Sequence, residues 1–142
     1  MNIHALSRHD VDALIAASHL FDDPVEPGRA VAFLERKETH CLIAYVDDEP
    51  AGFVTGVEIS HPDKPTEMLL YELGVDEQFR RQGIGTALTR ALASVAETGA
   101  LRGMWVLTEP GDVAAISTYR SAGAQEPEEA ALLEWPLAVQ RR

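Results

Sequence analysis

The segment with the clearest chemical content is Arg80-Arg81-Gln82-Gly83-Ile84-Gly85-Thr86, which lies between a strongly apolar run and an amphipathic run. Glycines let the backbone approach a ligand closely, and successive amide groups at the start of a helix form a concave site for anions. Adjacent arginines add charge-assisted hydrogen bonds to phosphate oxygens. The segment therefore predicts a phosphate site. The alternative is that the glycines only shape a strand-to-helix turn and that both arginines are solvated.

Two other phosphate motifs fit this segment less well. A P-loop ends in Gly-Lys followed by Ser or Thr, whereas a dinucleotide fingerprint has three spaced glycines and an acid at the end of the next strand. Neither pattern is present in the sequence.

The elements around the segment predict a mixed α/β domain. Residues 68–75 form a nearly continuous apolar run, typical of a central strand covered on both faces, and residues 83–98 carry one apolar stripe at helical spacing. Trp105 and Trp135 fall in apolar strands and are predicted to be core residues. Further strands are predicted at residues 2–6, 40–46, 51–59, 103–108 and 130–137, and further helices at residues 7–20, 29–37 and 112–122.

Length and charge limit what such a domain can do. The 142 residues, 46% of them hydrophobic, fit one globular domain over residues 1–142. The net charge of −11 disfavours a nucleic-acid partner, because it repels phosphate backbones. The same charge attracts a cationic partner, although an acidic surface also serves solubility alone.

Cysteine usage and hydropathy indicate a compartment. Cys41 is the one cysteine, which points to a reducing environment or an inert buried thiol. No run approaches the roughly 20 apolar residues of a membrane span, and the first residues are too polar for a signal peptide. We therefore expect a cytoplasmic protein with no membrane partner. The five histidines show no metal-ligand spacing, so no metal is expected.

The phosphate segment resembles the pyrophosphate-binding signature of the GNAT superfamily of acyl-CoA-dependent N-acetyltransferases. Arg80-x-x-Gly83-x-Gly85 matches that signature at every defined position. Ala115, Tyr119 and Gly123 stand at the spacing of the alanine, tyrosine and closing glycine of a later family helix. The resemblance covers essentially the whole chain. It implies a splayed mixed β-sheet flanked by helices, acetyl-CoA as the acyl donor and, by family habit, a homodimer.

A narrower resemblance is to the aminoglycoside 3-N-acetyltransferases. It is carried by Phe21-Asp22-Asp23-Pro24, by Leu70-Tyr71-Glu72-Leu73-Gly74-Val75, and by residues 80–84 and 112–119. The chain also departs from the patterns. Glu72 stands where the aminoglycoside enzymes usually have aspartate, Asp112 stands at the position of the common GNAT asparagine, as it does in the aminoglycoside subgroup, and Ala124 replaces an aromatic residue. These departures affect the predicted choice of acceptor and leave the predicted binding of acetyl-CoA unchanged.

Glu72 is the predicted general base, because the acceptor must attack as a neutral amine. Strand alternation predicts that it shares a face with Met68, Leu70 and Gly74. A carboxylate among apolar neighbours has a raised pKa. The alternative is a structural carboxylate paired with a buried arginine or a backbone donor.

The resemblance implies the remaining roles. Tyr119 would donate a proton or hydrogen bond to the departing thiolate, the alternative being a tyrosine that only packs in the core. A backbone amide in residues 73–75 would polarise the thioester carbonyl, the alternative being a bulge at Gly74. The predicted cofactor site comprises Leu73, Gly74, Val75, Arg80, Arg81, Gln82, Gly83, Ile84, Gly85 and Thr86. The predicted acceptor site comprises the acids Asp22, Asp23, Glu26 and Asp112, each of which is alternatively solvated surface.

Together these features predict an acyltransferase that moves an acetyl group from acetyl-CoA directly to a primary amine. The expected acceptor is the 3-amino group of an aminoglycoside, with antibiotic resistance as the consequence. Two alternatives stay open. One is an acetyltransferase for another polyamine, amino sugar or peptide amine, and the other is a non-catalytic acyl-CoA-binding sensor.

Overall fold

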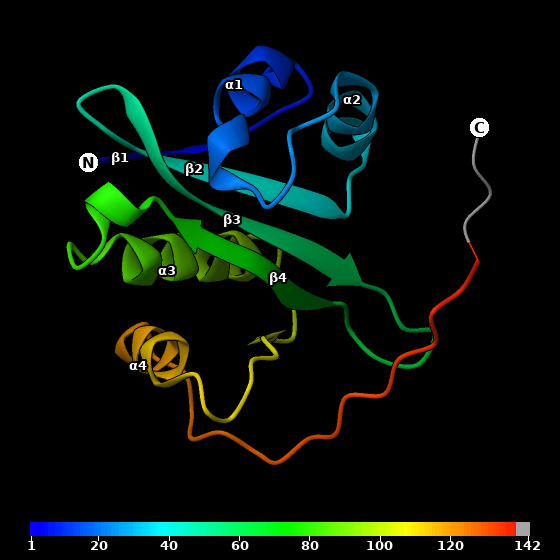
Figure 1. Cartoon of the computed structure of the whole chain (residues 1–142). Coiled ribbons are helices and arrows are strands. Elements are labelled where there is room, and N and C mark those ends of the chain that lie inside the picture. The colour runs from blue at the N-terminus through cyan, green and yellow to red at the C-terminus, as the bar shows by residue number, and fades with distance from the viewer. Residues whose placement is uncertain (139–142) are drawn as a thin grey trace.

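A five-stranded mixed sheet organises the computed structural model, which describes residues 1–138 (Figure 1). Helices α1 (Val11–Ala16) and α2 (Pro27–Glu35) cover one face, and α3 (Ile84–Thr98) and α4 (Val113–Ser121) lie on the other side. The 3₁₀ helices η1 (Ser18–Leu20) and η2 (Glu77–Phe79) lie in the loops. The strands follow chain order, antiparallel except for the parallel pair β4–β5: β1 (Asn2–Ala5), β2 (Thr39–Val46), β3 (Glu49–Ile59), β4 (Glu67–Val75) and β5 (Met104–Trp105).

The sheet separates two apolar cores. On β2, Leu42 and Ala44 pack toward α3, whereas Cys41 and Ile43 pack toward α1 and α2. Both faces are therefore buried, which explains why the central strands have apolar runs without alternation. The residues 47–48 that join β2 to β3 both have positive φ, 49° and 66°, as a type I′ hairpin turn requires.

A β-bulge in β4 sets the direction of Glu72. The pairing with β3 advances by two residues on β4 between Leu70 and Glu72, so Tyr71 is the extra residue. Leu73, after the bulge, packs against the same core as Leu70, before it. Glu72 and Gly74 therefore face the α1–α2 side. Uninterrupted alternation predicted Glu72 on the same face as Met68 and Leu70; that placement is wrong because the bulge reverses the direction.

Thr55 on β3 holds the bulge. Its side chain is 4% exposed, and its hydroxyl accepts a hydrogen bond from the backbone N–H of Glu72 at 3.1 Å. Thr55→Val keeps the shape but removes the acceptor, so we expect the free energy of unfolding to fall by about 1–3 kcal/mol in urea titrations. Thr55→Ser retains the hydroxyl and is the matched control. A Thr55→Val variant as stable as the parent would show that this hydrogen bond does not hold the bulge.

The C-terminal part differs from the prediction. Residues 130–137 form no strand, and the chain runs away from the sheet beyond α4 (Figure 1). β5 has two residues, because it parts from β4 after Trp105. Trp105 is 40% exposed and Trp135 is 75% exposed, so both core predictions are wrong. An apolar pattern predicts burial, but it does not supply the neighbouring strand that would bury it.

Among residues 1–138, no helix has the length and apolar character needed to cross a membrane.

Candidate functional site

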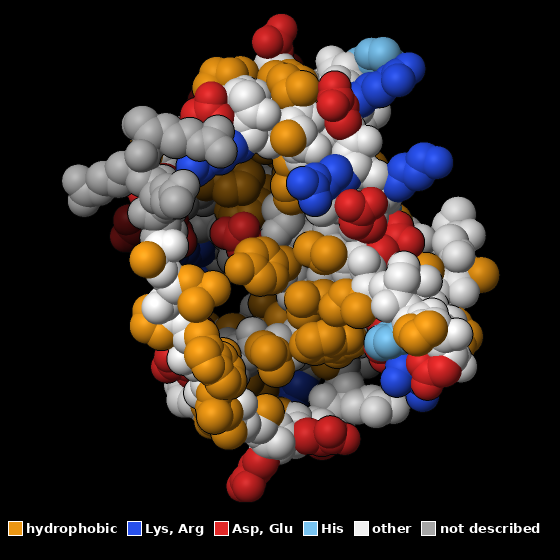
Figure 2. Space-filling view, turned by 90° about the vertical axis from the view of Figure 1, so that its right-hand side faces the viewer, with side chains coloured by type: hydrophobic (Ala, Val, Ile, Leu, Met, Phe, Trp, Pro, Cys, Tyr) orange, Lys and Arg blue, Asp and Glu red, His pale blue; other side chains and the backbone are white. Residues whose placement is uncertain are grey.

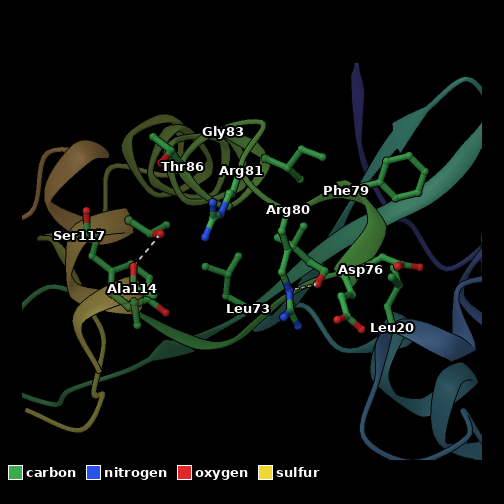
Figure 3. A pocket seen from close by; sticks show the side chains of 18 of the residues that line it. Leu20, Leu73, Asp76, Phe79, Arg80, Arg81, Gly83, Thr86, Ala114 and Ser117 are labelled. Atoms are coloured by element: carbon green, nitrogen blue, oxygen red, sulfur yellow. Dashed lines mark hydrogen bonds between the residues drawn. The ribbon is translucent and has the colours of Figure 1, made fainter. Parts of the chain in front are cut away.

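A cleft of about 1190 Å³ opens where β4 and β5 part (Figure 3). Among residues 1–138, the two strands pair at Met68–Met104 and Leu69–Trp105 only, and no strand of this part of the chain covers the outer edge of the later part of β4. The cleft is lined by the end of β4, the loop that follows it, the first turn of α3 and one face of α4. It therefore joins a free strand edge to a helix N-terminus.

The backbone of β4 presents polar groups to this cleft. The N–H groups of Glu72 and Asp76 donate to acceptors on β3 at 3.1 and 2.8 Å. Because backbone groups alternate in direction along a strand, the N–H and C=O groups of Leu73 and Val75 point to the opposite edge, into the cleft. They can pair with an amide-containing ligand or donate to a carbonyl oxygen.

The start of α3 has backbone geometry that suits an anion. Gly83 is the N-cap with φ of 77°, in the left-handed region, and no side chain caps the first turn in the described structure. The first amide that donates within the helix is that of Ala87, to the carbonyl of Gly83 at 3.0 Å. Ile84, Gly85 and Thr86 line the cleft, and their N–H groups belong to the first turn, where a helix supplies no acceptor. The positive end of the helix dipole adds to the attraction for an anion.

The two arginines stand beside this turn. The Nε of Arg80 donates to the carbonyl of Val75 at 3.3 Å, which ties its side chain to the end of β4. Arg81 has φ of 64°, so the backbone turns sharply before Gly83. Both guanidinium groups project into the cleft (Figure 3). Gln82, which the sequence grouped with them, does not line it.

Tyr119 lies on α4, on the far wall of the cleft, and is partly buried. Desolvation, and to a smaller extent the charge of Asp112, raises the pKa of its phenol, so the hydroxyl stays protonated at neutral pH. Asp112 caps α4 by accepting from the N–H of Ala115 at 3.0 Å. Close packing holds the helix against α3, because a Cβ on Gly85 would lie 3.2 Å from Thr118.

Glu72 is exposed at the rim on the α1–α2 side, next to cleft residue Leu73 but outside the lining itself. Desolvation, followed by the charge of Asp22, raises the pKa of its carboxyl. Asp22 does line the cleft. Cys41 lies behind this wall, and burial, with a smaller contribution from Glu72, raises the pKa of its thiol to about 12. Such a thiol is a poor nucleophile at neutral pH.

The predicted acid cluster is not assembled as a group. Asp22 and Asp112 line the cleft, whereas Asp23 and Glu26 do not. Glu26 accepts from the N–H groups of Gly28 and Arg29 at 2.9 and 2.8 Å, which lowers its pKa and starts α2 two residues earlier than predicted. In this structure the Glu26 side chain caps α2 and lies outside the cleft lining.

Sequence reasoning missed several lining residues. On α4, Ala114, Ser117, Thr118 and Ser121 share one face, and their spacing of three or four residues was the available signal. The loops add His19, Leu20, Asp76, Glu77 and Phe79, which no motif marks. Within residues 1–138, no group of three His, Cys, Asp or Glu side chains is arranged to hold a metal ion.

Residues 8–124 match the Acetyltransferase (GNAT) family, which covers most of the chain and both walls of the cleft. The chain belongs to the GNAT family.

Curated relatives of this GNAT chain include the [ribosomal protein bS18]-alanine N-acetyltransferases of Escherichia coli (strain K12) and Salmonella typhimurium (strain LT2). The first is 33% identical over 60 residues, covering 42% of this chain and 40% of the relative. The second is 32% identical over 81 residues, covering 56% of this chain and 51% of the relative. The chain therefore spans about half or less of the length of the curated relatives that it matches.

Solved structures extend the likeness to the whole fold. An aminoglycoside acetyltransferase from an uncultured soil metagenomic sample, in complex with sisomicin, has a TM-score of 0.89 at 19% identity over 96% of both chains. The aminoglycoside N-acetyltransferase AAC(6')-Iy, in complex with CoA, has a TM-score of 0.74 at 17% identity. The match covers 94% of this chain and 93% of that structure's chain. The predicted GNAT fold, with its mixed sheet flanked by helices, is confirmed.

Proposed function

We propose that this GNAT chain is an acetyl-CoA-dependent N-acetyltransferase that acts directly on a primary amine. The observation that carries the proposal is the juxtaposition in one cleft of the uncapped start of α3, two arginines and the free edge of β4. A coenzyme with a diphosphate at one end and an amide-containing arm has complementary groups. The non-catalytic sensor would need only this part of the site.

The residues present fit acetyl-CoA. The N–H groups of residues 84–86 and the guanidinium groups of Arg80 and Arg81 would hold the diphosphate. The edge groups of Leu73 and Val75 would pair with the amides of the arm. A volume of about 1190 Å³ is ample for a ligand of this size. When bound, acetyl-CoA supplies an activated acetyl thioester.

Three groups of this chain would then serve the transfer. The N–H of Leu73 or Val75 polarises the carbonyl, because it points into the cleft with no sheet partner. Glu72, with its raised pKa, takes the proton of the acceptor ammonium, directly or through water. Tyr119, which stays protonated at neutral pH, donates to the leaving sulfur. Glu72, at the rim on the α1–α2 side, and Tyr119, on α4, lie on different sides of the cleft, so separate groups would serve the acceptor amine and the leaving sulfur.

We propose an amine-rich cation as the acceptor, with the 3-amino group of an aminoglycoside as its target. The cleft is lined by Asp22, Asp76, Glu77 and Asp112, and the net charge of −11 concentrates cations near it. A second candidate is the N-terminal amine of a peptide, which the likeness to the bS18-alanine enzymes favours.

Thiol release from acetyl-CoA tests these alternatives. The acceptors are sisomicin, spermidine and a peptide with N-terminal alanine, and the acetylated position is assigned by NMR. We expect turnover with sisomicin and acetylation at its 3-amino group. Turnover with the peptide alone would favour the second candidate. Binding of acetyl-CoA in calorimetry, without turnover on any acceptor, would contradict an enzyme and favour the sensor.

Removing the phenolic hydroxyl tests the leaving-group role. We expect Tyr119→Phe to lower kcat by about 10²-fold, in the range of general acid catalysis, with little change in the Kd of acetyl-CoA. Tyr71→Phe is the matched control, since Tyr71 is 66% exposed on β4 and outside the cleft lining. Unchanged turnover of Tyr119→Phe at saturating acetyl-CoA would show that Tyr119 only packs against the core.

A further inference from the structure

Arg90 stands at the end of the cleft where α3 and α4 meet. It lies one turn after Thr86 on α3, so the two side chains share a helix face, and Thr86 lines the cleft. The Cα–Cβ bonds of a helix tilt toward its N-terminus. The side chain of Arg90 therefore starts out toward the first turn of α3.

A contact between the two helices anchors this side chain. The Nη2 of Arg90 donates to the backbone carbonyl of Ser121 at 2.6 Å, and Ser121 lines the cleft. Arg90 is not itself one of the lining residues. Its guanidinium therefore lies at the margin of the cleft, within hydrogen-bond distance of the wall.

The charge of Arg90 is not neutralised by a carboxylate. Among residues 1–138, the ion pairs involve other side chains. A guanidinium has five N–H groups, and the contact with Ser121 uses one of them. The alternative role for Arg90 is only to cap the C-terminal end of α4, which carries partial negative charge. Such a cap still leaves donors for a second acceptor.

Three hydroxyl side chains line the cleft near this contact. Thr86 belongs to α3, and Ser117 and Ser121 belong to α4. Figure 3 shows Thr86 and Ser117 on these two walls. Arginine and hydroxyl side chains together form a donor set typical of phosphate sites.

Another cavity, of about 1020 Å³ beside β5, suits a phosphate less well. Its wall includes the apolar residues Leu70, Met104 and Ile116, and its acids Glu128 and Glu129 repel phosphate. Figure 2 shows hydrophobic side chains on both sides of a hollow in one face of the molecule. The α3–α4 end of the cleft is therefore the better place for a further phosphate.

We propose that Arg90, Ser117 and Ser121 bind the phosphate on the 3′-oxygen of the coenzyme ribose. The proposal rests on the proposed function, because it needs acetyl-CoA in the cleft. The ribose is joined directly to the diphosphate, which the first turn of α3 would hold. One helical turn, roughly 5.4 Å, separates Thr86 from Arg90, and one sugar ring spans a comparable distance. The 3′-phosphate is therefore within reach of the guanidinium.

Selectivity for CoA over 3′-dephospho-CoA is the consequence. The net charge of −11 by itself favours the dephospho form, which carries less negative charge. Tighter binding of CoA therefore requires a cation close to the 3′-phosphate, and Arg90 supplies it.

Calorimetry with CoA and 3′-dephospho-CoA as the two probes tests the proposal. We expect the parent to bind CoA about tenfold more tightly, near the lower end for charged hydrogen bonds, because Arg90 is exposed. Arg90→Gln can still donate to the Ser121 carbonyl but has no charge. It should bind CoA as weakly as dephospho-CoA, with the Kd of dephospho-CoA unchanged. An equal loss of affinity for both probes would show a purely structural role and overturn the proposal.

Two further variants keep the test independent of Arg90→Gln. Ser121→Ala retains the carbonyl that anchors Arg90 and removes the hydroxyl, so the preference for CoA should fall about two- to fivefold. Arg120→Gln is the matched control, because Arg120 pairs with Glu126 and does not line the cleft. Its preference should equal that of the parent.

The two probes also separate this proposal from the proposed function. A parent that binds both probes with equal affinity would overturn the 3′-phosphate site and leave the acetyl-CoA site standing. A tenfold preference that persists in Arg90→Gln would also overturn it. A parent that binds neither probe would contradict the acetyl-CoA site itself.

Discussion

Replacing Glu72 with glutamine is expected to lower kcat by about 10²–10³-fold and to leave the Kd of acetyl-CoA almost unchanged. The amide keeps the size of the side chain but cannot accept a proton from the acceptor ammonium. Stopped assays of acetylated product, combined with calorimetry for acetyl-CoA, separate the two quantities. Glu49→Gln is the matched control, because Glu49 is exposed at the start of β3, away from the cleft. Near-normal turnover of Glu72→Gln would remove this residue as the base.

The pH dependence gives the same hypothesis a second measurement. Glu72 acts when it is deprotonated, so kcat should fall as the pH decreases through the pKa of its carboxyl. That pKa is raised, so the fall should occur at a higher pH than for an ordinary carboxyl. Asp22 contributes to that rise through its negative charge. Asp22→Asn should therefore move the acid limb of the profile to lower pH, whereas Asp23→Asn should move it less. If the acid limb of Asp22→Asn stays at the pH of the parent, the limb does not report the protonation of Glu72.

The sequence predicted the turn at residues 80–86 well because its geometry is local. Gly83 takes positive φ, and the helix begins at Ile84, one residue after the predicted start. Most of the strands and helices predicted up to residue 122 are formed, with bounds that shift by one or two residues. The strand predicted at 103–108 has two residues, and the helix predicted at 7–20 divides into α1 and η1. The GNAT signature depends on this part of the chain, which explains why the family could be named from residues alone.

The direction of Glu72 could not be predicted in the same way. It depends on a bulge opposite Thr55, and the partner of a bulge is not visible in one strand's sequence. The same limit applies to Glu26, whose role as a helix cap depends on the entry of the chain into α2. Trp135 shows a third limit, since apolar character predicts burial but does not supply a surface that would bury the side chain, which is 75% exposed.

Replacing both Arg80 and Arg81 with alanine is expected to raise the KM for acetyl-CoA by about 10²-fold or more, because each lost charged hydrogen bond is worth roughly 10–100-fold. Saturating acetyl-CoA should restore most of kcat, since neither side chain is assigned to proton transfer. Arg36→Ala is the control for charge alone, because Arg36 follows α2 and does not line the cleft. A KM equal to that of the parent would contradict the diphosphate site.

Salt distinguishes local attraction from the field of the whole protein. The net charge of −11 repels an anionic coenzyme, so binding by the parent must depend on short-range contacts with the two arginines and the start of α3. Salt screens both effects. We expect added salt to weaken acetyl-CoA binding to the parent, where attraction dominates, and to strengthen it in the double variant, where repulsion dominates. The same salt dependence in both proteins would mean that the arginines do not contact the diphosphate and that the amide groups of α3 hold it alone.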